Sequence, residues 1–294
     1  MSALLSLFQV AFLAHMLGTL GFVLVGALGN RLVGQRRLQF DGAVLAVVVR
    51  EWAAIVCALP SLAFGLGQPP PPRVAGARPP VLLVHGYGLN RSSMWLIRRY
   101  LLGRGHQAVW CVNHSPRHAP LPVLARGLVR QIEALKAATG ADQVDIVGHS
   151  MGGVLAGWAA ARLDAARDIR RLVTLGSPWR GTRMGFLAWH PEARDLAPDS
   201  AVIADLDPRV IPVVSIWSPE DNIILPAESS VMDGMVTQVI AGAGHTELLL
   251  RPSVWRAVAE ALDVADLSLL PPTVLPSERR LPELSAELSA ELAG

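Results

Sequence analysis

Short apolar runs alternate with stretches of helical periodicity through most of the chain. Runs rich in branched apolar residues are typical of buried strands, and they occupy residues 81–84, 144–147, 171–175, 210–217 and 238–241. Residues 121–138 and 252–264 have helical spacing with suitable end signals. This alternation predicts an α/β fold with a mostly parallel, doubly wound sheet that is covered by helices on both faces.

A serine framed by glycines follows the strand expected at 144–147. Residues 148–152 read Gly-His-Ser-Met-Gly and lead into an apolar helical segment, so Ser150 lies at a strand-to-helix corner. A sharp turn of this kind strains the backbone of the serine and exposes its hydroxyl, while the glycines let helix and strand approach closely. The pentapeptide alone is only suggestive of a nucleophile.

Three further loops after expected strands carry residues suited to acyl chemistry. A glycine-rich turn at 85–88 exposes backbone N–H groups, an acidic turn covers 218–222, and a glycine-framed histidine ends the segment 242–245. The chain order is therefore serine, acid, histidine. This is the order of the alpha/beta-hydrolase triad, and it differs from the orders in chymotrypsin-like and subtilisin-like proteases.

With these motifs, residues 79–264 resemble the alpha/beta-hydrolase superfamily, and more narrowly the small bacterial triacylglycerol lipases and esterases. The resemblance covers roughly two-thirds of the chain and implies little room for a large lid; segment 183–209 is the only candidate for a short cap. The motifs that carry it are Val-His-Gly-Tyr-Gly at 84–88, Gly-His-Ser-Met-Gly-Gly at 148–153, Leu-Gly-Ser-Pro-Trp-Arg-Gly-Thr at 175–182 and Gly-His at 244–245.

The chemistry of ester cleavage assigns roles to these residues. Ser150 is the expected nucleophile, His245 the base that takes its proton, and Asp221 the carboxylate that orients the imidazole. The backbone N–H of Met151, the residue after the nucleophile, is expected to bind the oxyanion. By resemblance, the second oxyanion donor is the N–H of Tyr87.

The acid is the least certain of these assignments on sequence grounds. Glu220 adjoins Asp221, and Asp205 and Asp207 lie upstream, so several carboxylates compete for the role. Among the histidines, only His245 lies in a glycine-framed loop near the end of the hydrolase region.

No metal or cofactor is expected. His114 and His118 flank residues 115–117 at a spacing that suits a metal, but no cysteine or paired acidic motif accompanies them. The expected structure there is a loop. His85 and His149 are expected to hold their turns by hydrogen bonds.

The N-terminus is far more apolar than the rest. A run of 25 residues without a formal charge extends from Leu4 to Leu28, enough to span a bilayer as a helix, and it is too long for a typical signal peptide. A second apolar stretch at 44–66 contains Arg50-Glu51 and Pro60, which favour an interfacial or hairpin placement. The alternative is an ordinary helix packed on the hydrolase core.

The sequence thus predicts a membrane-anchoring helical region at 1–67, a proline-rich linker at 68–80, a hydrolase domain at 81–264 and a tail at 265–294. The expected location is a membrane of the bacterial inner-membrane type. The sequence does not decide which side of the membrane the catalytic domain faces, because this depends on whether the second stretch crosses the membrane. The net charge is +2 with a single lysine, and no basic stripe suggests nucleic acid.

These features predict a membrane-associated serine ester hydrolase, a lipase or carboxylesterase that works through an acyl-enzyme. The expected partners are an acyl-ester or lipid substrate and membrane lipids. Two alternatives stay open: an acyltransferase that uses the same acyl-enzyme, and a non-catalytic membrane scaffold or receptor with the hydrolase fold.

Overall fold

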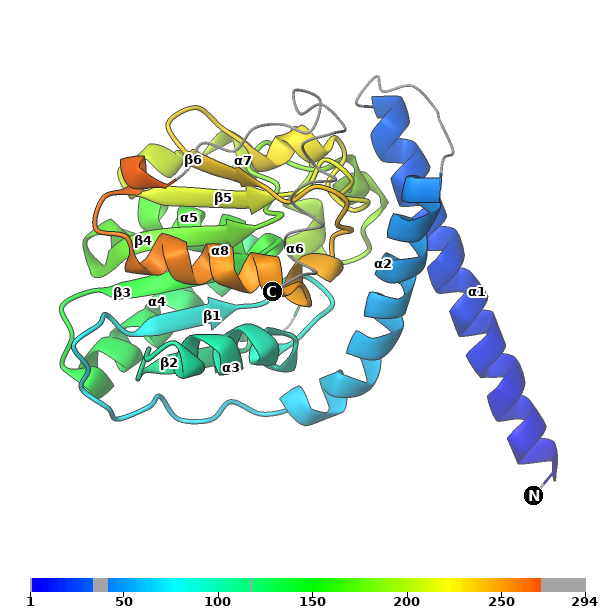
Figure 1. The fold of residues 1–294 in the computed structure, drawn as a ribbon, viewed down its shortest axis with the longest axis horizontal. Coiled ribbons are helices and arrows are strands. Elements are labelled where there is room, and N and C mark those ends of the chain that lie inside the picture. The colour runs from blue at the N-terminus through cyan, green and yellow to red at the C-terminus, as the bar shows by residue number, and fades with distance from the viewer. Residues whose placement is uncertain (1, 34–41, 117, 271–294) are drawn as a thin grey trace, which may run out of the picture.

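The computed structural model describes residues 2–33, 42–116 and 118–270, and its centre is a parallel sheet (Figure 1). Six strands in the order β2-β1-β3-β4-β5-β6 all pair in parallel. The predicted parallel sheet is confirmed. Its strands are β1 Val81–Val84, β2 Val109–Val112, β3 Val144–His149, β4 Ile169–Leu175, β5 Val213–Trp217 and β6 Val236–Val239.

Helices cover both faces of the sheet, as the alternation of elements predicts. Helices α4 and α5 pack on one face, and α3 and α8 on the other. Two very short helices, α6 and α7, lie in the segment 183–209. The helices are α1 Ser2–Val33, α2 Gly42–Ser61, α3 Trp95–Gly103, α4 Leu121–Thr139, α5 Met151–Arg162, α6 Pro191–Arg194, α7 Ala201–Ala204 and α8 Pro252–Asp263.

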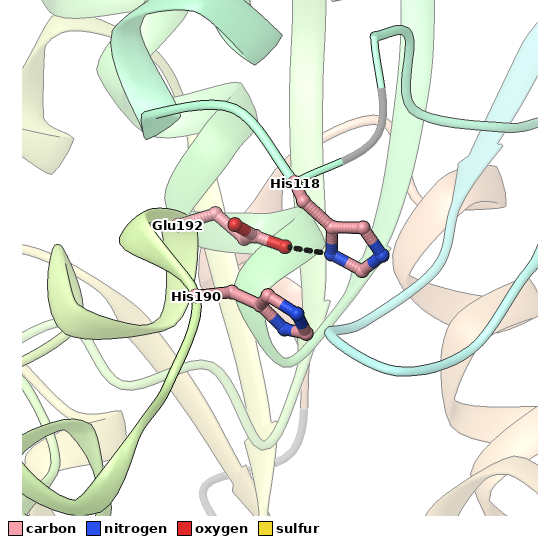
Figure 2. A group of neighbouring side chains, drawn as sticks. All are labelled: His118, His190 and Glu192. Atoms are coloured by element: carbon pink, nitrogen blue, oxygen red, sulfur yellow. Dashed lines mark hydrogen bonds and ion pairs between the residues drawn. The ribbon is translucent and has the colours of Figure 1, made fainter.

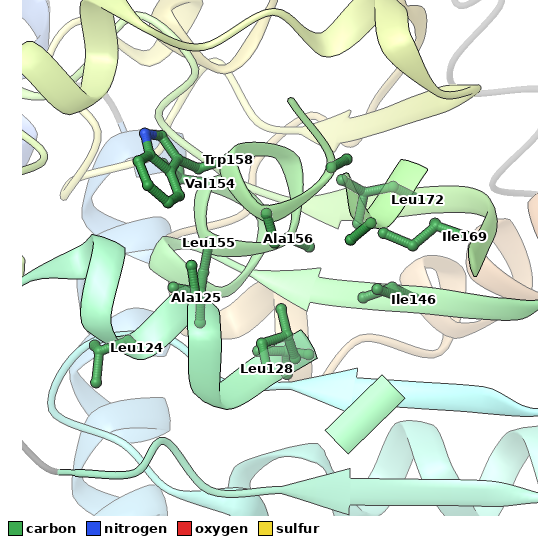
Figure 3. Packing of buried hydrophobic residues seen from close by; sticks show 14 of the residues in the cluster. Leu124, Ala125, Leu128, Ile146, Val154, Leu155, Ala156, Trp158, Ile169 and Leu172 are labelled. Atoms are coloured by element: carbon green, nitrogen blue, oxygen red, sulfur yellow. The ribbon is translucent and has the colours of Figure 1, made fainter. Parts of the chain in front are cut away.

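Alternate side chains of each strand enter two separate cores. In β1, Leu82 packs with α4 and α5 while Leu83 packs with α3 and α8. Figure 3 shows the first core, where side chains of α4 and α5 meet those of β3 and β4. Because both faces are buried, every residue of β1, β3 and β5 is buried, which explains the continuous apolar runs in the sequence.

Helices α1 and α2 lie side by side across the edge where the strands end (Figure 1). Their contact includes hydrogen bonds from the indole N–H of Trp52 to Met16 O (3.1 Å) and to Thr19 Oγ1 (3.2 Å).

The transmembrane span predicted over residues 4–28 is not supported. In the part of the chain that the structure describes, no helix has both the length and the apolar character needed to cross a membrane. The second stretch, predicted as interfacial or as one arm of a hairpin, forms α2 and packs against the loops that follow β5 and β6. The predicted tail lies outside the described residues from 271 onward.

Candidate active site

The loops at the carboxyl edge of the sheet hold the residues predicted to act together. Ser150 follows β3, Tyr87 follows β1, Asp221 follows β5 and His245 follows β6. The chain leaves β1 toward β2 on one side and returns to β3 on the other, so this edge includes the switch point at which open α/β sheets bind ligands.

Ser150 has the backbone of a strained turn. Its φ of 54° and ψ of −123° lie in a region that residues other than glycine rarely adopt. A hydrogen bond from its N–H to Leu175 O (2.8 Å) holds the turn on β4. At Gly152, a Cβ would lie 2.4 Å from Val84 O, so a side chain there would push the helix off the sheet. Such strain persists only where the surroundings enforce it and is common at reactive residues.

Asp221 and His245 form a buried hydrogen-bonded pair. The Nδ1 of His245 lies 2.7 Å from Oδ2 of Asp221. The other oxygen of Asp221 accepts hydrogen bonds from the N–H groups of Ile223 (2.8 Å) and Ile224 (2.9 Å), which fix the carboxylate in place. This is the contact that a carboxylate needs in order to set the tautomer of an imidazole.

The other carboxylates weighed from the sequence lie elsewhere. Glu220 accepts hydrogen bonds from the N–H of Gly242 (2.7 Å) and from Ser218 Oγ (3.3 Å), and thus links the two loops without touching His245. The remaining two carboxylates make surface ion pairs, Asp205 with Arg162 and Asp207 with Arg209.

Opposing effects act on the pKa of His245. Burial lowers this pKa, but the charge and hydrogen bond of Asp221 and the charge of Glu51 outweigh burial, so the pKa is raised above its ordinary value. A raised pKa makes the imidazole a better proton acceptor and stabilises the imidazolium that forms when the nucleophile is deprotonated.

His245 contacts the serine turn through His149, the residue before Ser150. Among the described residues no hydrogen bond joins the two side chains, an arrangement common in unliganded sites, where such bonds tighten only with substrate. The ring of His149 lies 4.7 Å from that of His245, and its Nε2 donates to His245 O (3.3 Å). Burial lowers the pKa of His149 well below its ordinary value, which keeps it neutral in this role.

The two residues predicted to bind the oxyanion lie beside Ser150. Met151 is the first residue of α5, where backbone N–H groups have no partner within the helix. Tyr87 lines the same groove as Ser150. The turn that carries Tyr87 is held by His85, as expected, because His85 Nδ1 donates to Gly86 O (2.8 Å). His114, which was expected only to lie in a loop, also holds it, because its Nε2 donates to His85 O (2.9 Å).

An apolar groove of about 500 Å³ opens above Ser150. One wall comes from residues 182–196, most of which belong to the predicted cap at 183–209, and includes Leu187 and Trp189. The facing wall belongs to α1 and includes Phe22 and Val25.

Comparison with known proteins agrees with the fold. Residues 79–202 match the family model described as the alpha/beta hydrolase fold. The chain has an alpha/beta-hydrolase fold. The loops that carry Ser150, Asp221 and His245 follow β3, β5 and β6, in the chain order serine, acid, histidine.

Solved structures resemble the chain over about two-thirds of its length. Lipase B of Aspergillus fumigatus matches with a TM-score of 0.58 and 17% identity, over 67% of this chain and 56% of that one. A mature lipase of Bacillus licheniformis matches with a TM-score of 0.53 and 13% identity, over 66% of this chain and 96% of that one. The lin2722 product of Listeria innocua matches with a TM-score of 0.51 and 19% identity, over 64% of this chain and 95% of that one. At these identities the likeness establishes the fold alone, and this chain spans little more than half of the fungal lipase.

Sequence reasoning missed two residues of the N-terminal helices that hold the loops of the hydrolase. Glu51 of α2 is fully buried, and its two oxygens accept hydrogen bonds from the N–H groups of Thr246 and Glu247, each at 2.8 Å. The signal was present in the charged pair Arg50-Glu51 inside an apolar helix. On sequence grounds alone, this pair predicts a position at the membrane interface.

Asn30 of α1 performs a similar task on the acid loop. Its Nδ2 donates to Pro219 O (2.9 Å) and Asp221 O (2.8 Å), and its Oδ1 accepts from the N–H of Ala227 (3.0 Å). Asn30 is buried, so these bonds replace solvent at three backbone groups. Helices α1 and α2 therefore act as supports of the candidate site.

Proposed function

We propose that this hydrolase cleaves carboxylic esters through an acyl-enzyme on Ser150. The observation that carries the proposal is the 2.7 Å bond between Asp221 and His245 at the same sheet edge as a strained Ser150. The three residues come from loops after three different strands. An arrangement that combines a strained serine with a carboxylate-paired imidazole is suited to nucleophilic acyl transfer.

In the proposed reaction, Ser150 Oγ attacks the ester carbonyl carbon while His245 Nε2 takes the hydroxyl proton. The N–H groups of Met151 and Tyr87 donate to the oxyanion of the tetrahedral intermediate. The bond to the leaving oxygen then breaks, and His245 returns the proton to the departing alcohol. Water attacks the acyl-enzyme with the same base, which releases the carboxylic acid and restores Ser150.

The groove supports an apolar acyl group as the substrate portion next to Ser150. Side chains of Phe22, Val25, Leu187 and Trp189 line it, and each of them is substantially exposed. An acyl chain bound there would remove apolar surface from water on both partners, which is worth about 25 cal/mol per Å². Lipid esters and medium- to long-chain acyl esters fit this chemistry.

Association with a membrane surface and an inner-membrane location stay part of the proposal. Exposed apolar side chains border the groove, with Trp189 89% exposed and Leu187 70% exposed, and exposed apolar clusters of this kind mark lipid or protein contacts. Cell fractionation together with sedimentation on phospholipid vesicles tests this part; a protein found only in the supernatant of both would contradict it.

The function is tested by hydrolysis of p-nitrophenyl esters of graded chain length with the full chain. We expect turnover of apolar acyl esters and covalent labelling of Ser150 by a fluorophosphonate. Absence of both would overturn the proposal. Analysis of products with added alcohol acceptors separates hydrolysis from acyl transfer.

A substitution in the α1 wall should change chain-length preference. Val25→Trp fills the groove, so the ratio of kcat/KM for long-chain to short-chain esters is expected to fall about tenfold, the effect of losing about 1.4 kcal/mol of apolar contact. The matched control is Leu32→Trp, which puts the same bulk on an exposed position of α1 that does not line the groove. Equal chain-length profiles for the two variants would exclude α1 from the acyl site.

A further inference from the structure

Two histidines and a glutamate meet beside the predicted oxyanion loop, although the sequence suggested no metal site. His118 lies in the loop between β2 and α4, while His190 and Glu192 belong to the segment 183–209 (Figure 2). One potential ligand atom from each lies within 4.8 Å of the other two. The histidine that the sequence paired with His118 is elsewhere: His114 donates to His85 O.

Two of the three potential ligand atoms are already in contact. His118 Nδ1 and Glu192 Oε1 are hydrogen-bonded at 2.9 Å, and they would have to separate to about 3.4 Å to bind one tetrahedral zinc ion at about 2.0–2.2 Å each. The rings of His118 and His190 stack with centroids 3.9 Å apart and an interplanar angle of 25°. An ion lies in the plane of each imidazole that binds it, so one of the two rings must turn for both histidines to bind the same ion.

Tyr87 orients the second histidine. The phenol oxygen of Tyr87 lies 2.7 Å from His190 Nδ1, which leaves Nε2 of that ring available. Histidines that bind metals usually have their other ring nitrogen hydrogen-bonded in this way, because the bond sets the tautomer and the ring orientation.

Within the described part of the structure, one carboxylate oxygen of Glu192 is buried without a hydrogen-bond partner. Its side chain is 4% exposed, and its Oε2 is buried with no hydrogen bond. Within the described ranges, the salt bridge of Glu192 is to His118 and to no lysine or arginine. A buried carboxylate oxygen without a partner is destabilising, and a cation is the partner that would compensate it best.

We propose that His118, His190 and Glu192 bind a divalent first-row metal ion, foremost Zn²⁺, that ties the segment 190–192 to the loops after β1 and β2. Two imidazoles and one carboxylate suit zinc and its first-row neighbours, whereas calcium and magnesium prefer oxygen ligands alone. Three protein ligands leave a fourth position for water.

The test measures metal binding directly on the full chain, purified without a polyhistidine tag and treated with chelator. Calorimetric titration with Zn²⁺ should show one ion per chain, Zn²⁺ should raise Tm, and Co²⁺ should give visible absorption bands. His190→Ala and Glu192→Ala should each weaken binding at least tenfold and abolish the Tm increase.

The control variant is His245→Ala, because the buried His245–Asp221 pair is the competing place for a metal ion. It should retain the ion and the Tm increase. Circular dichroism of the metal-free variants confirms that they fold. No Zn²⁺ binding to the unaltered chain, or binding that survives both substitutions, would overturn the site.

A second inference concerns Glu51, and it rests on the proposed function. Glu51 fills the space beside the histidine loop so closely that a Cβ on Gly244 would lie 2.4 Å from its Oε2. Its hydrogen bonds go to the two residues after His245. The neighbouring Arg50 donates to Glu247 Oε1 (2.8 Å) and to Gly242 O (2.7 Å), so α2 contacts the loop on both sides of the histidine.

We infer that Glu51 is a positioning residue that also supplies a second negative charge to the His245 imidazolium. Three groups face this imidazole: Asp221 from the loop after β5, His149 from the turn before Ser150, and Glu51 from α2. Glu247 and Arg50 lie further along the same contact. His149 is neutral, so the two carboxylates dominate. Burial raises the pKa of Glu51 above its ordinary value, and the N–H groups of Thr246 and Glu247 and the charge of His245 offset that increase only in part.

The expected result for Glu51→Gln is a 10- to 100-fold lower kcat. In the pH profile of kcat/KM, the acidic limb should also move to lower pH. The sign follows because Glu51 raises the pKa of His245, and the base must be neutral to act; without the charge, neutral imidazole persists to lower pH. Glu51→Asp should restore part of the original limb.

Asn30→Ala provides the matched comparison, since it removes loop support without removing charge. It should lower kcat and leave the limb in place. If the acidic limb of the pH profile stays in place in Glu51→Gln, Glu51 is only a structural support and the inference is overturned. The pKa of His245, measured by NMR on labelled imidazole, tests the same claim without turnover, so a failure of the proposed ester hydrolysis is distinguishable.

Discussion

Replacing Ser150 by alanine is expected to reduce ester turnover about 10⁶-fold, the scale seen when the nucleophile of a serine triad is removed. Without the hydroxyl no acyl-enzyme forms, and only the oxyanion donors and substrate binding remain. Alanine has the same Cβ as serine, so the cost of the positive φ is unchanged and the fold should persist. The measurements are p-nitrophenyl ester turnover, fluorophosphonate labelling and Tm.

Ser268→Ala is the control, because Ser268 is exposed near the end of the described chain and lies outside the groove. It should keep full turnover and labelling. If Ser150→Ala retained turnover or bound the fluorophosphonate as before, Ser150 would not be the nucleophile.

Replacing Asp221 by asparagine is expected to reduce kcat about 10⁴-fold through an error of tautomer. The amide oxygen can keep the bonds from the N–H groups of Ile223 and Ile224, so the amide NH₂ takes the place of Oδ2 and faces His245 Nδ1. Nδ1 must then accept a hydrogen bond from the amide, so the proton of the neutral imidazole lies on Nε2. An imidazole in this tautomer cannot take the proton of Ser150.

Glu220→Gln is the matched control for this change. It alters the adjacent residue by the same exchange of an oxygen for an NH₂ group, and its remaining oxygen can still accept from Gly242 N. We expect kcat to stay within a few-fold of the unaltered protein. A small effect at Asp221 together with a large one at Glu220 would move the orienting role to Glu220.

Element boundaries show where periodicity stops being informative. The strand predicted at 210–217 begins only at Val213, because Pro208–Val210 forms a 3₁₀ turn and Pro212 has no N–H for a ladder. The strand predicted at 238–241 is Val236–Val239, although Ile240 N still donates to Trp217 O (2.8 Å). Both runs are apolar beyond the strand, so hydrophobicity alone cannot mark the ends.

The N-terminal region shows a deeper limit. An apolar helix has the same sequence pattern whether it faces lipid or packs on protein, and the charges of Arg50 and Glu51 fit either setting. The bonds of Glu51 and Asn30 join residues nearly 200 positions apart, Glu51 with Thr246 and Asn30 with Asp221. No local pattern reports contacts at that separation.

Local periodicity and the glycines at turns were enough to predict the alternation of strands and helices, the strained serine turn and the order of the polar loops. The folded chain was needed to show which carboxylate contacts His245 and that α1 forms a wall of the groove. It was also needed to show that Glu51 reaches the histidine loop and that His118 meets His190 and Glu192. Each of these depends on where parallel strands bring their carboxyl ends and on which side chains then share a buried space.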